Sequence, residues 1–191
     1  MEKFGVVIFL GLVAQGPLQI SSYLDQCKSV QEKSGFNRQQ FFRGDWFVTH
    51  ANDGTVSTLC RKYSISENSD DKLIVQYGTR GNKHQYFCME KNANSQAPHI
   101  FYCVVTQGDR CAIVQVYEVQ KTILETDGKS ALLYRCLKMA APEGDKYINT
   151  FLVLNREENG QVSQTVKDAL SAQGLEFGNL LSRQVILVQR N

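Results

Sequence analysis

Two copies of a His-x3-Cys spacing, His84 to Cys88 and His99 to Cys103, supply side chains that zinc prefers. In an extended strand, residues four positions apart are separated by roughly 13 Å, too far for one metal ion to bind both. If Cys88 faces Cys103 across an antiparallel pair, the two histidines diverge toward opposite ends of the hairpin. The spacing therefore predicts a cross-strand disulfide, and no metal site is expected.

The tripeptide Arg43-Gly44-Asp45 is the second feature with possible chemistry, because integrins bind this sequence on exposed loops. Integrin recognition needs a projecting, mobile loop, whereas here the tripeptide leads directly into Trp46 at the start of a predicted strand. We expect Gly44 to allow a tight turn into that strand and Trp46 to face inward. Integrins are therefore not expected as partners.

The residue types give little support for catalysis. The chain has three histidines, and none lies in a recognisable Ser–His–Asp or Cys–His pattern. No glycine-rich loop of the kind that cradles phosphates follows a predicted strand. The sequence therefore does not predict an enzyme.

The elements that must position these residues are short strands separated by turn signals. Groups such as Asn52-Asp53-Gly54 and Pro142-Glu143-Gly144 recur between apolar stretches. Strands at this regular spacing predict an all-β sandwich or barrel. The expected strands are Trp46–His50, Leu59–Ile65, Lys72–Tyr77, His84–Met89, Ile100–Thr106, Ala112–Thr122, Ala131–Leu137 and Tyr147–Leu154.

One stretch near the C-terminus has helical periodicity. Val162, Val166, Ala169 and Leu170 follow i, i+4, i+7, i+8 spacing and form one apolar face. Eight strands followed by one amphipathic helix predict an up-and-down antiparallel barrel with the helix packed on its wall. We see no linker or internal repeat, so residues 23–191 are expected to form a single domain.

The N-terminal residues 1–22 have the features of a secretory signal peptide. Lys3 and the α-amino group precede an apolar stretch from Phe4 to Ala14, and cleavage is expected between residues 16 and 22. All six cysteines follow this segment. An even number of cysteines in a secreted chain predicts three disulfides.

The overall composition limits the classes of partner. The chain has 191 residues, of which 42% are hydrophobic, and a formal net charge of +2. A protein that binds nucleic-acid phosphates normally shows a basic stripe, and none is visible. No apolar run reaches the roughly 20 residues that a bilayer-spanning helix needs. We therefore expect neither a nucleic acid nor a membrane as partner.

Three sparse motifs, Gly44-x-Trp46, Thr126-Asp127 and Arg156, occur in the order typical of the lipocalin family. The chain resembles that family, which implies an eight-stranded lipocalin (calycin) barrel. The resemblance also implies that Trp46 plugs the closed end of the barrel while Arg156 packs across its ring. A guanidinium can stack on an indole and stay charged while partly buried.

A closer similarity covers nearly the whole mature chain. FFRGDWFVTH, the segment CRKY at 60–63, TDGKSALLYRC at 126–136 and the stretch 162–177 are similar to the triabin, pallidipin and nitrophorin group of salivary lipocalins from blood-feeding bugs. This resemblance implies a protein secreted in saliva that impairs host haemostasis by trapping a small agonist without turnover. We expect inhibition of platelet aggregation.

The same resemblance implies a Cys27–Cys136 disulfide. It would also pair Cys60 with a cysteine in the C-terminal tail, but residues 183–191 contain none. A Cys60–Cys111 bridge is therefore a hypothesis, with two free thiols as the alternative. Haem-binding members of the group need an axial histidine where this chain has Gln76, whose amide is not a comparable iron ligand. No cofactor, haem included, is expected.

A small-ligand site is expected inside the barrel. Period-2 alternation from the inward Trp46, with matching parity on the other strands, predicts a mostly apolar lining with a few polar groups. The predicted lining residues are Val48, His50, Ile74, Gln76, Tyr117, Val119, Leu133, Arg135, Leu137, Ile148, Thr150 and Leu152.

Arg135 suggests the ligand's charge, because an unpaired buried guanidinium is costly and needs a counter-charge. A carboxylate on an apolar tail would supply it, which favours an eicosanoid such as thromboxane A2. If the register is shifted by one residue, Arg135 lies on the surface instead. The alternatives are a scavenger of biogenic amines, which Arg135 would repel, and an inhibitor of the coagulation protease thrombin. The latter favours an acidic surface, which the net charge of +2 does not supply.

Overall fold

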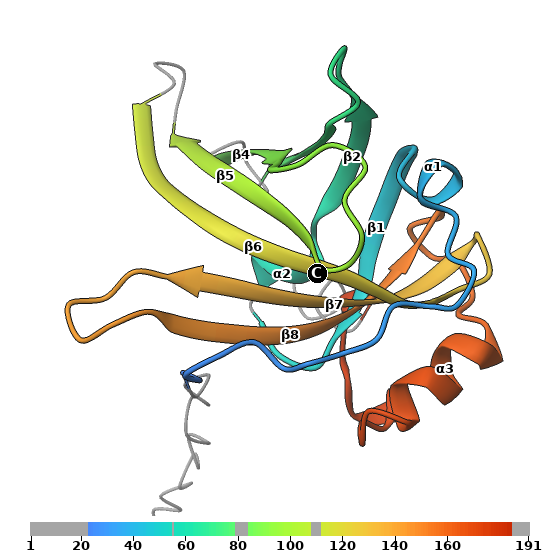
Figure 1. The fold of residues 1–191 in the computed structure, drawn as a ribbon. Coiled ribbons are helices and arrows are strands. Elements are labelled where there is room, and N and C mark those ends of the chain that lie inside the picture. The colour runs from blue at the N-terminus through green and yellow to red at the C-terminus, as the bar shows by residue number, and fades with distance from the viewer. Residues whose placement is uncertain (1–22, 55, 79–83, 108–111, 185–191) are drawn as a thin grey trace, which may run out of the picture.

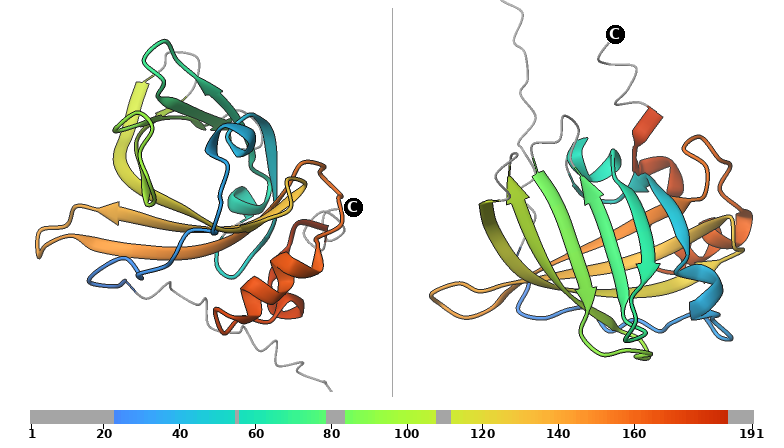
Figure 2. Two further views of the ribbon diagram at one scale, coloured as in Figure 1. Left: turned by 45° about the vertical axis from the view of Figure 1, so that its right-hand side comes forward. Right: turned by 90° about the horizontal axis from the view of Figure 1, so that it is seen from above.

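The computed structural model of the protein describes residues 23–54, 56–78, 84–107 and 112–184. Eight antiparallel strands close into a barrel, because β1 pairs with β2 on one side and with β8 on the other (Figures 1 and 2). A two-residue strand, β9, also pairs with β1. The strands are β1 (Gly44–Ala51), β2 (Lys62–Glu67), β3 (Leu73–Gly78), β4 (His84–Glu90), β5 (His99–Gln107), β6 (Ala112–Thr126), β7 (Ser130–Met139), β8 (Lys146–Asn155) and β9 (Leu181–Ser182).

The predicted eight-stranded all-β barrel is confirmed, and the strand boundaries differ by up to four residues; β6, for example, continues to Thr126. The strand predicted over Leu59–Ile65 begins later, at Lys62, because Val56–Leu59 forms a single turn of helix, α2. None of the helices in the described ranges is long and apolar enough to cross a membrane. The predicted signal peptide, residues 1–22, lies outside the described residues.

The short helix α1 (Arg38–Phe41) covers one end of the barrel. Asn37 caps it by accepting a hydrogen bond from the Gln40 N–H at 2.9 Å. The Phe41 ring then stacks on the buried Trp46 ring, with 4.6 Å between the ring centroids, and the Trp46 Nε1–H donates to the Phe41 carbonyl oxygen at 2.9 Å. This aromatic plug closes the barrel at the end where β1 begins.

The predicted C-terminal helix is present as α3 (Gln164–Ser171), which lies outside the barrel wall (Figure 2). Val166 and Leu170 are completely buried against the outer faces of β7 and β8. A 3-10 turn, η1 (Phe177–Asn179), follows the helix and places the Phe177 ring against the same wall. The helix is therefore held mainly by its apolar face.

Strands β7 and β8 alternate between two hydrophobic cores. Leu133 lies opposite Leu152, and both point into the barrel, whereas Tyr134 lies opposite Phe151, and both pack under α3. These two strands pair without a bulge from Ser130 to Met139. One wall thus separates the barrel interior from the helix interface.

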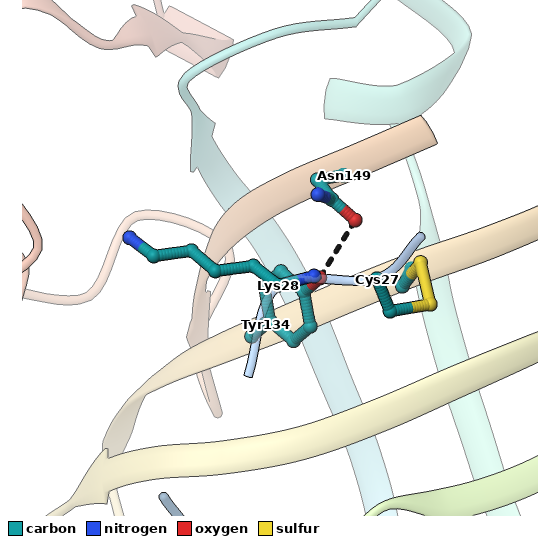
Figure 3. The surroundings of a disulfide bond; sticks show 5 residues. Cys27, Lys28, Tyr134 and Asn149 are labelled. Carbon is teal, nitrogen blue, oxygen red and sulfur yellow. Dashed lines mark hydrogen bonds between the residues drawn. A yellow bond between two sulfur atoms is a disulfide. The ribbon is translucent and has the colours of Figure 1, made fainter. Parts of the chain in front are cut away.

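The N-terminal segment runs across the outside of the barrel and is fixed to β7 and β8. The predicted Cys27–Cys136 disulfide is confirmed. Beside it, the Lys28 N–H donates to the Tyr134 hydroxyl at 2.7 Å, and that hydroxyl donates to the Asn149 side chain at 2.6 Å (Figure 3). The segment preceding α1 is therefore anchored covalently to the barrel.

Candidate ligand-binding site inside the barrel

Most of the residues predicted to line the barrel face its interior. Arg135 lies opposite the buried residues Lys121 and Thr150, and its neighbours Leu133 and Leu137 belong to the interior core. The alternative that places Arg135 on the surface is therefore wrong. The inward-facing residues of the predicted set are Val48, Tyr117, Val119, Leu133, Arg135, Leu137, Ile148, Thr150 and Leu152.

The inward placement predicted for His50 is wrong, because β1 contains a bulge at Thr49. Adjacent residues of β8 pair with Val48 and His50, so Thr49 is left over and the alternation shifts by one residue. His50 consequently lies on the outer wall, where its ring packs 4.5 Å from the Phe177 ring. Burial, and then the charge of Lys167, lower the pKa of His50.

The inward placement predicted for Ile74 and Gln76 is also wrong, because the register of β3 is opposite to the expected one. Both residues pair with outward-facing serines of β2, and Gln76 is exposed. Gln76, which occupies the position expected to carry an axial haem ligand, therefore points away from the interior and does not fit that role. The buried residues of β3 that face inward are Leu73, Val75 and Tyr77.

Lys121, which was not predicted from the sequence to line the barrel, is buried in the interior. Its side chain is only 5% exposed. The ammonium lies 4.6 Å from the centre of the Phe101 ring and 5.1 Å from that of Tyr63. Burial, and then the charges of Arg135 and Arg61, lower the pKa of Lys121 to about 7.

Arg61 is a second interior cation that was not predicted from the sequence. It precedes β2, is 8% exposed, and its guanidinium lies 5.1 Å from the centre of the Tyr77 ring and 5.8 Å from that of Tyr86. Its Nε and Nη1 atoms are buried and have no hydrogen-bond partner among the described residues. Leaving buried donors unpaired is costly. The Arg61 guanidinium is therefore available to a hydrogen-bond acceptor other than the described residues, such as a bound ligand.

Tyrosine rings complete the surroundings of these cations. The Tyr77 ring stacks on Tyr86 with centroids 4.4 Å apart and meets Tyr63 edge-on at 5.0 Å. The Tyr77 and Tyr117 hydroxyls lie 2.8 Å apart. Burial raises the pKa of both of these hydroxyl groups, so they stay neutral donors and acceptors near neutral pH.

We call Arg61, Lys121 and Arg135 the cation trio. Within the described ranges, none of the three forms an ion pair with a carboxylate. A low-dielectric interior lined by apolar and aromatic rings holds positive charge that protein carboxylates do not neutralise. This arrangement is suited to binding an anion that carries apolar groups.

At the closed end, the predicted contact between Arg156 and Trp46 is confirmed. The guanidinium carbon lies 3.8 Å from the centre of the Trp46 ring. The same guanidinium donates to the carbonyl oxygens of Phe41 and Asp45 at 3.0 Å each. Arg156 thus joins the end of β8 to α1 and the start of β1.

The predicted turn at Thr126-Asp127 links β6 to β7 at this end. The Thr126 hydroxyl donates to the Ser130 carbonyl oxygen at 2.8 Å, and the Asp127 carboxylate accepts from the backbone N–H groups of Lys129 and Ser130. Burial raises the pKa of Asp127, but these hydrogen bonds outweigh it and lower the pKa below its ordinary value. The role of these two residues is to close the turn.

In the Arg-Gly-Asp sequence, Arg43 precedes β1, and Gly44 and Asp45 are its first two residues. Gly44 has a φ of +65°, a conformation that favours glycine, and begins the strand. The Asp45 carboxylate pairs with the Lys62 ammonium at 2.7 Å and accepts from the Ser64 hydroxyl at 2.8 Å. This carboxylate is held by β2, which is unlike the mobile loop that integrin recognition needs.

The predicted Cys88–Cys103 disulfide is confirmed and faces the barrel interior. Both thiols are therefore unavailable to zinc, and no metal-binding group of three or more His, Cys, Asp or Glu residues is present in the described parts of the chain. Cys60 carries a free thiol after α2. The hypothesised Cys60–Cys111 bridge involves Cys111, which lies outside the described residues.

Solved structures of other proteins share this architecture. LTBP1, in a complex with leukotriene C4, is 23% identical and has a TM-score of 0.61 over 85% of this chain and 97% of that one. Insecticyanin from the tobacco hornworm Manduca sexta is 13% identical, with a TM-score of 0.55 over 82% of this chain and 85% of its own. A closed eight-stranded barrel, plugged at one end by Trp46 and carrying one external helix, defines the chain as a lipocalin in its fold.

Sequence comparison narrows this class. Triafestin-2 from Triatoma infestans is 27% identical over 195 residues, which cover 98% of this chain and 93% of the relative. Nitrophorin-3 from Rhodnius prolixus is 22% identical over 172 residues, covering 85% and 83%. The Nitrophorin family model matches residues 27–186, and the chain therefore belongs to the nitrophorin family.

Proposed function

We propose that this protein is a secreted salivary carrier that binds a small amphipathic anion inside its barrel and thereby inhibits host platelet aggregation. The cation trio is the observation that carries this proposal. Three basic side chains face an interior of apolar and aromatic groups, and described carboxylates pair with none of them. An anionic ligand would remove the cost of burying these charges.

An eicosanoid fits the chemistry of the interior. Its carboxylate can pair with Arg61 and Arg135, and its hydrocarbon chain can lie against inward residues such as Val119 and Leu137. The leukotriene C4 complex of LTBP1 supports this class of ligand for the fold. We propose thromboxane A2 as the agonist that is sequestered, by stoichiometric binding without turnover.

Two other functions fit the interior and the charge less well. A biogenic amine would be repelled by the cation trio. An anticoagulant that binds the basic exosite of thrombin would need an acidic surface, and the formal net charge of the chain is +2.

Isothermal titration calorimetry tests the proposal. We expect tight binding of a stable thromboxane mimic or of leukotriene C4, and weak binding of serotonin. Arg61→Ala and Arg135→Ala should each cost about 2–5 kcal/mol of binding free energy, because the anion loses a charged hydrogen bond. Gln76→Ala is the matched control, since Gln76 lies on the outer face of the same barrel and should not alter binding.

Platelet assays connect binding to function. The parent protein should inhibit aggregation by a thromboxane mimic until the agonist exceeds the protein in molar amount, as expected of a stoichiometric trap. Arg135→Ala should lose this inhibition. Tight serotonin binding with no response to the lipids would show that the proposed ligand class is wrong.

A further inference from the structure

Lys121 occupies an unusual place in the barrel, between aromatic rings and other basic groups. It is 5% exposed, and its ammonium lies over the rings of Phe101 and Tyr63. Neighbouring strands and its own strand bring several titratable or charged groups to this face. They are Tyr63 from β2, His99 from β5, Tyr117 from β6, Arg135 from β7 and Arg61 from the turn before β2.

The carboxylates at the closed end do not compensate Lys121. His99, its register partner on β5, has its ring nitrogens 2.9 Å from Glu32 and 3.5 Å from Glu90. Glu90 is also paired with Arg38 at 2.6 Å. These acids are bound within their own network, so no carboxylate in the described part of the chain forms an ion pair with the cation trio.

The two types of basic side chain respond differently to this crowding. An arginine keeps its charge under all ordinary conditions, whereas a buried lysine loses its proton when that relieves desolvation and repulsion. In a ligand-free barrel, Lys121 is therefore the member of the trio that becomes neutral. Its pKa, lowered to about 7 by burial and by Arg135 and Arg61, agrees with this assignment.

We propose that Lys121 sets the preference of the barrel for anions by taking up a proton together with the ligand. This inference rests on the anion-binding function proposed above and names the residue that regulates it. When an anion binds beside the trio, its negative charge favours the ammonium form of Lys121. The group that relieves repulsion in the empty barrel thus becomes a third cation toward the ligand.

The sign of the pH dependence follows from this linkage. The ligand-bound form holds more protons than the ligand-free form at a pH between the two pKa values of Lys121, so anion affinity falls as the pH rises through that range. Below the ligand-free pKa of about 7, both forms are protonated and affinity should be constant. Above it, affinity should fall by up to about tenfold per pH unit.

A matched pair of fluorescent probes isolates the protein's own proton. Anilinonaphthalene sulfonate keeps its negative charge at every pH tested, and N-phenylnaphthylamine is nearly the same molecule without the sulfonate. We expect the affinity for the sulfonate to fall between pH 7 and pH 9, while the affinity for the neutral probe does not fall. Calorimetry in buffers of different ionisation enthalpy should show that the sulfonate brings a proton into the protein, approaching about one at pH 8.

Substitutions at Lys121 assign the effect. Lys121→Arg keeps a permanent cation, so the sulfonate should still bind but with an affinity that no longer depends on pH. Lys121→Met should bind the sulfonate at every pH about as weakly as the parent does at pH 9. Lys138→Met is the control, because Lys138 lies on the outer face of β7 and pairs with Asp145.

The outcomes separate this inference from the function on which it rests. Sulfonate affinity that is constant from pH 6 to pH 9, with no proton uptake, would overturn the role of Lys121 and leave the anion site standing. Failure of every anionic probe to bind would overturn the proposed function. NMR titration of labelled lysine side chains in the ligand-free protein decides the matter independently, since a Lys121 midpoint near 10.5, its ordinary value, would contradict the inference.

Discussion

Arg156 and Trp46, separated by 110 positions in the sequence, meet face to face at the closed end of the barrel, with 3.8 Å between the guanidinium carbon and the ring centre. Arg156 also donates to backbone carbonyl oxygens of α1 and β1. One side chain therefore ties the last barrel strand to the first.

Replacing Arg156 should destabilise the fold more than replacing an exposed arginine. A desolvated cation–π contact contributes up to about 2 kcal/mol, and hydrogen bonds from a charged group add about 1.5–3 kcal/mol. We expect Arg156→Ala to lower the free energy of unfolding by about 2–4 kcal/mol. Urea titration followed by the fluorescence of Trp46, the only tryptophan in the chain, measures it. Arg43→Ala, an exposed side chain nearby, should change stability by less than about 0.5 kcal/mol.

The two disulfides should contribute unequally to stability. The Cys27–Cys136 bridge closes a loop with a sequence separation of 109, and the Cys88–Cys103 bridge closes one of 15. Chain-entropy arguments give about 4.7 kcal/mol for a loop of roughly 100 residues and about 3 kcal/mol for one of roughly 15. Denaturation of the two double Cys→Ala variants compares them. A smaller loss on removing Cys27–Cys136 would mean that the N-terminal segment is held mainly by its other contacts.

Glu90 should make the closed end sensitive to acid. Its carboxylate is 1% exposed and pairs with Arg38 at 2.6 Å. Burial alone raises the pKa of Glu90, but hydrogen bonds outweigh it and lower the pKa below its ordinary value of 4.5; the donors are His99, the Leu73 N–H, Ser95 and Arg38. Because the folded pKa is lowered, this stabilisation is present above pH 4.5 and is lost as the pH falls through the folded pKa.

The Glu90→Gln variant tests this dependence. At pH 7 it should be less stable than the parent by about 3 kcal/mol, because Arg38 loses a buried partner. The difference should shrink as the pH falls below 4.5 and through the lowered folded pKa, because the parent carboxylate takes up a proton there. Glu67→Gln is the control, since Glu67 pairs with the same arginine from an exposed position. A difference that stays constant from pH 7 to pH 3 would contradict the assigned charge state.

Adhesion assays examine the Arg-Gly-Asp sequence directly. Hydrogen bonding from Lys62 and Ser64 lowers the pKa of Asp45 and keeps its carboxylate paired with β2. We expect neither the parent protein nor Asp45→Glu to support or block integrin-dependent adhesion. A loss of anti-platelet activity that is confined to the Asp45 variant, with the fold intact, would show that the sequence is recognised after all.

Alternation predicted the interior correctly on β7 and β8, which pair without interruption. On β7 and β8, every predicted inward residue from Leu133 to Leu152 faces inward, because a continuous ladder fixes the parity. The same reasoning fails after Thr49, because a bulge there shifts the inward–outward alternation by one residue. No residue type near Thr49 predicts this bulge. On β3 the parity carried over from Trp46 is wrong, and the apolar residues Leu73, Val75 and Tyr77 mark the inward face.

The cations of the candidate site were harder to find from sequence. Lys121 follows Tyr117 and Val119 at the same parity, so the alternation already indicated it, but a lysine is seldom fully buried. Arg61 precedes its strand and has no periodicity to place it. The surroundings of Lys121 and Arg61 depend on how β2, β5 and β7 pack around the interior. The residue pattern of a single strand does not predict that packing.

The shared wall of β7 and β8 also bears on how such a protein can diverge. Inserting one residue into β7 would turn Tyr134 and Cys136 into the barrel and Arg135 under α3, which would disrupt two cores and a disulfide at once. Substitution at inward positions changes only the interior, because their neighbours along the strand belong to the other core. Within the family, single substitutions at inward positions of β7 and β8 should therefore change ligand preference. Insertions and deletions should accumulate in the loops instead.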